Sequence, residues 1–178
     1  MRIGVAGTHG IGKTTLVEDL STRNPDHVSV AEPYVLLEDQ GYEFGYPPSP
    51  SEYMVQFKAS LRLFRRPAPK AIFDRTPLDF VAYLRASGGE LESDADVEAL
   101  RSALTSLDLL VVIPITTDTE RSLPPADFAE LRKAMNDALL DLVYDDSLEV
   151  LGGVNLIELD CPLGRRTEQV SKALTRLA

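Results

Sequence analysis

The sequence has little cysteine, few basic residues and no long apolar run, and each shortage excludes a class of protein. Cys161 is the only cysteine in 178 residues, so no disulfide can form within the chain, and a reducing compartment such as the cytoplasm is expected. Acidic residues outnumber basic ones by 28 to 18, giving a net charge of −10, which argues against broad binding to nucleic acid or to an anionic membrane. No apolar run approaches the roughly 20 residues that span a bilayer.

The first 20 residues carry a glycine-rich loop between a short apolar strand (residues 3–6) and an amphipathic helix (residues 14–20). The loop, residues 7–14 (GTHGIGKT), matches G-x-x-x-x-G-K-T in the strand–loop–helix context that this motif requires. We call these residues the phosphate loop. Because residues 3–6 already predict a core strand, no cleavable signal segment is expected.

The physical chemistry of the phosphate loop predicts binding of a nucleoside triphosphate, with ATP and Mg²⁺ as the expected cofactors. Glycines let successive backbone N–H groups turn inward around a phosphate, and the following helix N-terminus adds partial positive charge. Lys13 can reach the β- and γ-phosphates, and the Thr14 hydroxyl can ligate Mg²⁺. Neither His9 nor His27 is assigned a catalytic role. The predicted cofactor-binding residues are Thr8, His9, Gly10, Ile11, Gly12, Lys13, Thr14 and Thr15.

The rest of the chain alternates short apolar strands with amphipathic helices. Strands are expected at residues 27–31, 71–73, 107–115 and 155–159, and helices at about 51–66, 77–85, 94–104, 124–144 and 165–177. This order predicts an α/β fold: a single domain over residues 1–178 in which a five-stranded parallel sheet is covered on both faces, the three-layer sandwich of P-loop nucleoside triphosphatases. Residues 34–50 are expected to be irregular, and their aromatic side chains could stack on a planar ligand, as in a substrate flap, or could simply cover the core. Residues 114–125 are a candidate lid.

Charged residues follow the expected strands at the edge where such sheets bind ligands. Asp74 suits an acid that holds Mg²⁺ through water or through Thr14. Glu32 is placed to act as a general base on an acceptor hydroxyl, although it could instead cap a helix or loop. Arg75 could bind the acceptor or orient a carboxylate, and the alternative is a surface salt bridge.

The expected lid carries one basic residue, Arg121. An arginine on a mobile loop can close over phosphates and offset the charge that develops during transfer, and an ion pair with a nearby acid is the alternative. Arg132, farther along, is a second candidate for this role.

These residues resemble the nucleoside and nucleotide kinase branch of the P-loop fold over most of the chain. The resemblance rests on GTHGIGKTT, on Glu32-Pro33, on Gln56 in YMVQFKASLRLF and on FDRTPLDFVAYL. It is greatest to deoxynucleoside kinases and to compact AAA-domain P-loop proteins related to the nicotinamide riboside kinase domain. It implies Glu32 as the base for a sugar hydroxyl, Gln56 as the reader of the nucleobase edge, and Arg75 as the residue that orients Glu32. The triplet at residues 74–76, Asp-Arg-Thr, is closer to thymidylate kinases.

The sequence therefore favours an ATP-dependent kinase for a small-molecule acceptor, such as a nucleoside, a nucleotide or a similar metabolite. Its expected catalytic residues are Lys13, Glu32, Arg75 and Arg121, with Thr14 and Asp74 at the metal and Glu32, Gln56 and Arg75 at the substrate. The alternative is an ATP-binding regulatory or interaction module, and a homodimer is left open. A GTPase is not expected because Asp-x-x-Gly and Asn-Lys-x-Asp are absent, and the chain is too short for an AAA+ motor.

Overall fold

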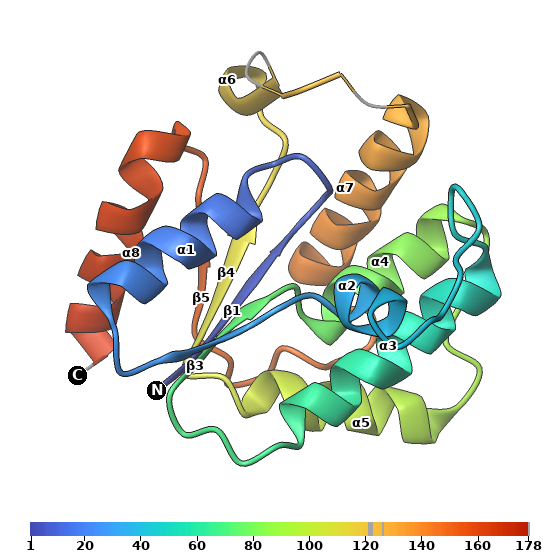
Figure 1. The fold of residues 1–178 in the computed structure, drawn as a ribbon, viewed down its shortest axis with the longest axis horizontal. Helices are drawn as coiled ribbons and strands as arrows, with labels where there is room; N and C mark the ends of the chain where they lie inside the picture. Colours follow the sequence, from blue (N-terminus) through green and yellow to red (C-terminus); the bar gives the residue numbers. More distant parts are fainter. Residues whose placement is uncertain (121–122, 126, 178) are drawn as a thin grey trace.

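A computed structural model describes residues 1–120, 123–125 and 127–177. Five strands form one sheet in the order β2-β3-β1-β4-β5, and every neighbouring pair is parallel. The strands are β1 (Arg2–Gly7), β2 (Val28–Val30), β3 (Ala71–Asp74), β4 (Leu109–Ile113) and β5 (Leu156–Glu158). Figure 1 shows the sheet between two layers of helices. The predicted three-layer α/β fold with a five-stranded parallel sheet is confirmed.

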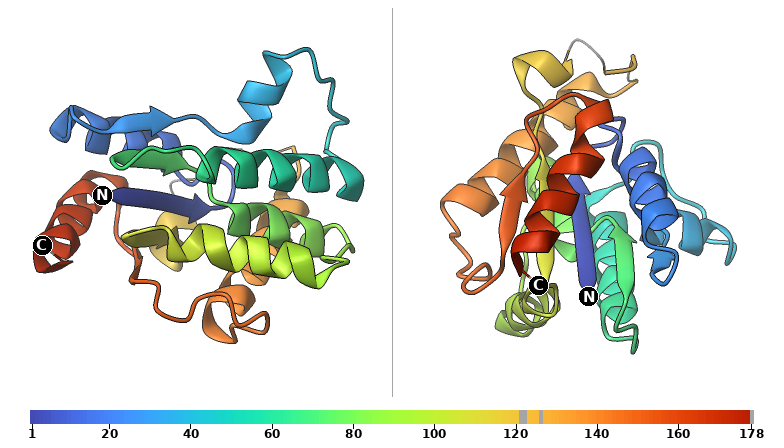
Figure 2. Two further views of the ribbon diagram at one scale, coloured as in Figure 1. Left: turned by 90° about the horizontal axis from the view of Figure 1, so that it is seen from below. Right: turned by 90° about the vertical axis from the view of Figure 1, so that its left-hand side faces the viewer.

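Helices α1 and α8 cover one face of the sheet, and α3, α4, α5 and α7 cover the other (Figure 2). The larger core lies under α3 and α4, where Phe57, Phe73 and Phe80 are buried. The helices are α1 (Lys13–Arg23), α2 (Pro33–Glu38), α3 (Pro50–Phe64), α4 (Pro77–Ala86), α5 (Asp94–Thr105), α6 (Thr117–Glu120), α7 (Ala129–Tyr144) and α8 (Leu163–Leu177). No helix in the described part of the chain is both long and apolar enough to cross a membrane.

Two segments expected to lack regular structure each contain a short helix. Helix α2 occupies the start of the expected flap because Pro33, at its first position, has a backbone angle already suited to a helix. Helix α6 lies within the expected lid. The long helix begins at Ala129 rather than near residues 124–127. In these three places the prediction from turn-forming residues was wrong.

Candidate active site

The phosphate loop joins β1 to α1 at the carboxyl edge of the sheet. Gly10 and Gly12 have φ angles of 74° and 90°, in the left-handed region that glycine adopts without steric cost. Lys13 is buried, and its ammonium donates a hydrogen bond to the Thr8 carbonyl at 2.8 Å. Burial lowers the pKa of Lys13 to about 8, with the charge of Arg75 adding to the effect. The loop thus surrounds a buried cation, as an anion-binding loop requires.

Thr14 and Asp74 lie side by side, as expected for a metal pair. The Thr14 hydroxyl donates to Oδ2 of Asp74 at 2.7 Å. The other carboxylate oxygen, Oδ1, is buried and has no hydrogen-bond partner among the described residues. Hydroxyl and carboxylate oxygens are the ligands that Mg²⁺ prefers. The donor set and the unpartnered oxygen therefore fit Mg²⁺ held between this pair and a bound triphosphate.

Glu32 and Arg75 form a hydrogen-bonded ion pair beside the loop. Arg75 is buried, so it is no surface salt bridge, and its Nη1 also donates to the Gly7 carbonyl at 3.2 Å. Glu32 stands at the N-cap position of α2, but its side chain makes no capping hydrogen bond. The backbone of Arg75 has a φ of 75°, which is costly for a residue other than glycine and typical of functional sites. Neither a helix cap at Glu32 nor a surface salt bridge at Arg75 accounts for this pair.

The charge of Arg75 changes the acidity of Glu32. Burial works to raise the pKa of Glu32, but the charges of Arg75 and Lys13 and the hydrogen bond from Arg75 outweigh it, so the pKa lies below its usual range. Glu32 is therefore ionised at neutral pH and able to accept a proton or a hydrogen bond.

This pKa predicts how the stability of the protein depends on pH. Because the pKa of Glu32 is lower in the folded than in the unfolded chain, its stabilisation is complete above the unfolded value and is lost as pH falls through the folded value. We expect Glu32→Gln to lower the free energy of unfolding at neutral pH, with the deficit shrinking in acid. Urea denaturation at several pH values measures this loss of unfolding free energy. Glu92→Gln, at an exposed position, is the control. A deficit that does not depend on pH would contradict the ion pair.

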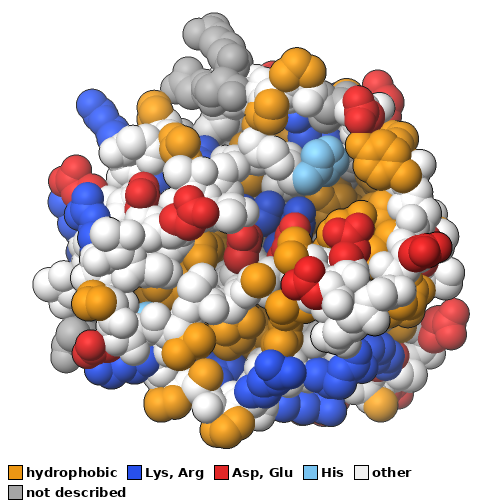
Figure 3. Space-filling view, viewed as in Figure 1, with side chains coloured by type: hydrophobic (Ala, Val, Ile, Leu, Met, Phe, Trp, Pro, Cys, Tyr) orange, Lys and Arg blue, Asp and Glu red, His pale blue; other side chains and the backbone are white. Residues whose placement is uncertain are grey.

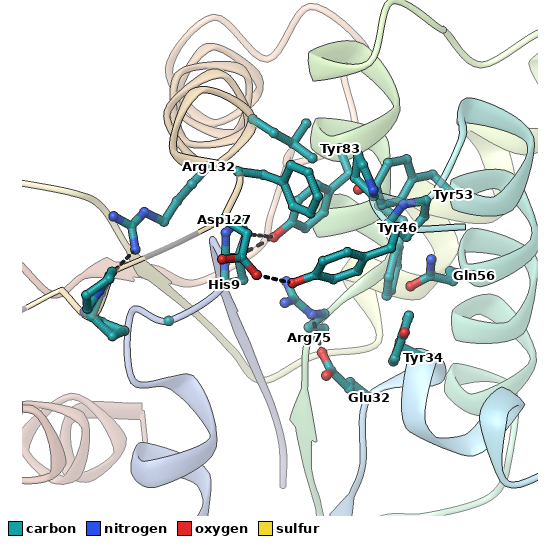
Figure 4. Close-up of a pocket in the computed structure, with 18 residues that line it drawn as sticks. His9, Glu32, Tyr34, Tyr46, Tyr53, Gln56, Arg75, Tyr83, Asp127 and Arg132 are labelled. Carbon is teal, nitrogen blue, oxygen red and sulfur yellow. Dashed lines mark hydrogen bonds and ion pairs between the residues drawn. The ribbon is translucent and has the colours of Figure 1, made fainter. Parts of the chain in front are cut away.

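A cavity of about 360 Å³ opens beside the Glu32–Arg75 pair. We call it the acceptor pocket. Figure 3 shows acidic, basic and apolar side chains gathered in a hollow of this face, and Figure 4 shows the pocket itself. Gln56 is buried on α3, and its Nε2 has no hydrogen-bond partner within the described structure. The pocket is lined mainly by rings and polar groups, including His9, Glu32, Tyr34, Tyr46, Tyr53, Gln56, Arg75, Phe80, Tyr83, Asp127, Phe128 and Arg132. Its walls are thus aromatic, with one unsatisfied amide donor.

The expected lid is only partly described. Arg121 lies outside the described residues, so the structure does not place it. Arg132, in the first turns of α7, lies beside the loop instead: its carbonyl accepts the Thr8 hydroxyl at 3.2 Å and its Nη1 donates to the Pro124 carbonyl at 2.8 Å. Of the two arginines considered for the lid, the structure therefore places Arg132 near the phosphate loop.

Three residues that sequence reasoning missed hold the phosphate loop in place. The Asp79 carboxylate accepts the Gly7 N–H at 2.8 Å, the Tyr83 hydroxyl accepts the His9 N–H at 3.0 Å, and Arg166 donates to the Ile11 carbonyl at 2.5 Å. A signal for Asp79 was present, because Thr76-x-x-Asp79 is a helix-start pattern whose acid also accepts the Thr76 N–H. Arg166 and Tyr83 had no such signal.

Comparison with known proteins agrees with this geometry. The family model described as "AAA domain" matches residues 2–151, and no curated protein matches the chain. A deoxyadenosine kinase from M. mycoides with bound dATP is 16% identical, over 98% of this chain and 99% of that one, with a TM-score of 0.65. Shikimate kinase from Aquifex aeolicus is 16% identical over 98% and 96%, with a TM-score of 0.58.

A second kind of match is to part of a larger protein. The NadR protein in complex with NAD and AMP-PNP is 19% identical, over 98% of this chain and 48% of that one, with a TM-score of 0.64. This chain spans about half of the NadR protein. At these identities, the solved structures establish the fold alone. The family model matches residues 2–151, which is most of the chain, and therefore establishes the family. The chain therefore belongs to the AAA domain family and has the P-loop nucleoside- and nucleotide-kinase-like fold.

Proposed function

We propose that the protein transfers the γ-phosphate of ATP to a hydroxyl group of a small acceptor bound in the acceptor pocket. The observation that carries the proposal is the ion pair of Glu32 with buried Arg75, set between the phosphate loop and the pocket. A loop that only bound ATP would need no ionised carboxylate on its acceptor side. The similar structures of a deoxyadenosine kinase and a shikimate kinase support phosphoryl transfer on this fold.

In the proposed reaction, the acceptor hydroxyl oxygen attacks the γ-phosphorus as its proton passes to Glu32. The bond from the γ-phosphorus to the β–γ bridging oxygen breaks, and ADP leaves. Lys13 and the loop amides hold the phosphates, and Arg75 keeps Glu32 ionised and oriented. Bound Mg²⁺ would neutralise charge on the β- and γ-phosphates. Arg132 is close enough to the loop to take the part first expected of Arg121.

The chemistry of the pocket favours an uncharged, planar acceptor such as a nucleoside. Tyr53 stacks on Tyr83 with ring centroids 5.0 Å apart, and aromatic walls of this kind pack well against a flat ring. The unpartnered Nε2 of Gln56 would donate to an acceptor atom on the edge of that ring. Arg75 already faces Glu32 and Asp79, which leaves it ill-suited to hold a phosphorylated acceptor.

A panel of acceptors tests the proposal directly. Purified protein with ATP and Mg²⁺ is offered nucleosides, nucleotides, shikimate and simple sugars, and ADP formation is measured against the rate without acceptor. We expect at least one nucleoside to accelerate ADP formation. We expect Lys13→Ala to remove this acceleration. If no acceptor raised ADP formation above background, the regulatory-module alternative would replace the kinase.

The metal pair gives a separate prediction. Asp74→Asn keeps the shape of the side chain and its bond from Thr14 but removes the charge. We expect it to raise the Mg²⁺ concentration for half-maximal ATP-dependent activity by about 10- to 100-fold, the usual effect of altering a group that orients a metal ligand. Asp26→Asn, which removes a charge that pairs with Lys70 far from the loop, should leave the Mg²⁺ requirement alone. An unchanged midpoint in Asp74→Asn would remove Asp74 from the metal site.

A further inference from the structure

The side chain of His9, on the phosphate loop, is held in place by Tyr83, which lines the acceptor pocket. Its backbone N–H donates to the Tyr83 hydroxyl at 3.0 Å, and its ring Nδ1 lies 2.9 Å from the same oxygen. The two rings are stacked, with centroids 6.3 Å apart. Tyr83 belongs to α4, stacks on Tyr53 and lines the acceptor pocket together with His9.

These contacts favour one of the two positions for the proton on the neutral His9 ring. The backbone N–H can only donate, so the Tyr83 oxygen accepts there and its own O–H is free to donate to Nδ1. A proton on Nδ1 would leave the Tyr83 hydroxyl hydrogen without an acceptor among the described residues. In a neutral imidazole with an accepting Nδ1, the proton sits on Nε2. His9 therefore presents an Nε2–H group.

The surroundings of His9 keep the ring neutral. Burial lowers its pKa to about 4, and the charges of Arg75 from the end of β3, Arg132 from α7 and Lys13 from α1 lower it further, against the opposing charge of Glu32. Three cations thus converge on one uncharged ring. A neutral imidazole can donate a hydrogen bond to a phosphoryl oxygen without adding a fourth positive charge to this site.

We propose that the Nε2–H of His9 donates a hydrogen bond to a non-bridging oxygen of the γ-phosphoryl group as it passes to the acceptor, with Tyr83 as the residue that positions the ring. His9 lies on the loop that holds the triphosphate and lines the same pocket as Glu32 (Figure 4). In the proposed reaction, the phosphoryl group passes from the loop that carries His9 to an acceptor bound beside Glu32. The donor moves no proton, since the acceptor proton goes to Glu32. The inference rests on the proposed kinase function.

Two substitutions at His9 test this role. His9→Ala is expected to lower kcat by about 100-fold, the size of effect seen when one transition-state donor is removed, with ADP affinity within about twofold of wild type because ADP lacks the γ-phosphate. His9→Gln carries an N–H donor at a similar reach and should recover about tenfold of the loss. Thermal unfolding of both variants checks that the fold is kept. An unchanged kcat in His9→Ala would overturn the proposal, and so would an equal fall in ADP affinity and kcat that His9→Gln does not restore.

A spectroscopic readout tests the positioning by Tyr83 without any acceptor. A long-range ¹H–¹⁵N NMR spectrum of the protein should show the Nε2–H form of His9 throughout pH 6–8, and Tyr83→Phe should convert the signal to a mixture of both neutral forms. A proton on Nδ1 in the wild type would overturn the assignment. Failure of the kinase function is recognised separately: wild-type protein would then show no acceptor-dependent ADP formation, whereas failure of the inference leaves wild-type turnover intact.

Discussion

Replacing Glu32 with glutamine is expected to lower acceptor-dependent ADP formation by about 10²- to 10⁴-fold while ATP affinity stays nearly unchanged. Glutamine fills the same space and can still accept a hydrogen bond from Arg75, but it cannot take the proton of the acceptor hydroxyl. Glu32 lies on the acceptor side of the loop and donates nothing to the phosphates. Turnover should therefore fall in this variant while its affinity for ATP is kept.

The control for Glu32→Gln must remove one negative charge from the same region. Asp39→Asn does so at an exposed position directly after α2, and it should leave turnover unaltered. Initial rates with saturating ATP and acceptor, together with ATP titrations, make the comparison. A Glu32→Gln enzyme as fast as wild type would exclude this carboxylate as the base, and one that lost ATP affinity would show that it acts on the donor site.

Replacing Lys13 with alanine is expected to weaken ATP binding by about 10- to 100-fold, the contribution of a charge-assisted hydrogen bond to phosphate. In the free protein the ammonium of Lys13 is turned onto the Thr8 carbonyl, so the cation is already buried and bound triphosphate would replace that contact. Because Lys13 would also stabilise charge on the moving phosphoryl group, the remaining turnover should fall by a further 10²- to 10³-fold, approximately.

Lys172→Ala is the matched control, since Lys172 pairs with Glu168 on the surface of α8. Isothermal titration with ATP and with ADP measures the effect, which should be larger for ATP because Lys13 reaches toward the β- and γ-phosphates. Undiminished ATP affinity in Lys13→Ala would mean that residues 7–14 do not form a triphosphate site, whatever the acceptor.

The sequence was sufficient to predict the sheet and the placement of Thr14 beside Asp74, because both depend on local patterns. The motif at residues 7–14 lies between a strand and a helix that the neighbouring residues predict. Asp74 follows a short run of apolar residues that predicts a strand. Thr14 and Asp74 were expected to cooperate, and they are hydrogen-bonded. Their roles with Mg²⁺ stay predictions until the metal is titrated.

The side chains that hold the phosphate loop in place were harder to predict, because they reach it from distant parts of the chain. Tyr83 resembles any core tyrosine until the fold brings it to His9, 74 positions earlier. Arg166 is buried, pairs with no carboxylate among the described residues, and reaches the loop from the last helix. No local sequence pattern predicts such a contact. For the same reason, His9 was expected only among the cofactor-binding residues of the loop and was given no catalytic role.

Helix α4 holds Gly7 through Asp79 and His9 through Tyr83, two side chains one helical turn apart. The same helix forms part of the acceptor pocket through Phe80 and Tyr83. An engineer who wished to change the preferred acceptor could not redesign this wall freely, because a shift of α4 would distort the donor site as well. Within the described structure, no hydrogen bond joins the flap or α3 to the phosphate loop, so Tyr34, Tyr46 and Gln56 are where new acceptor preferences can be selected at the least cost to that loop.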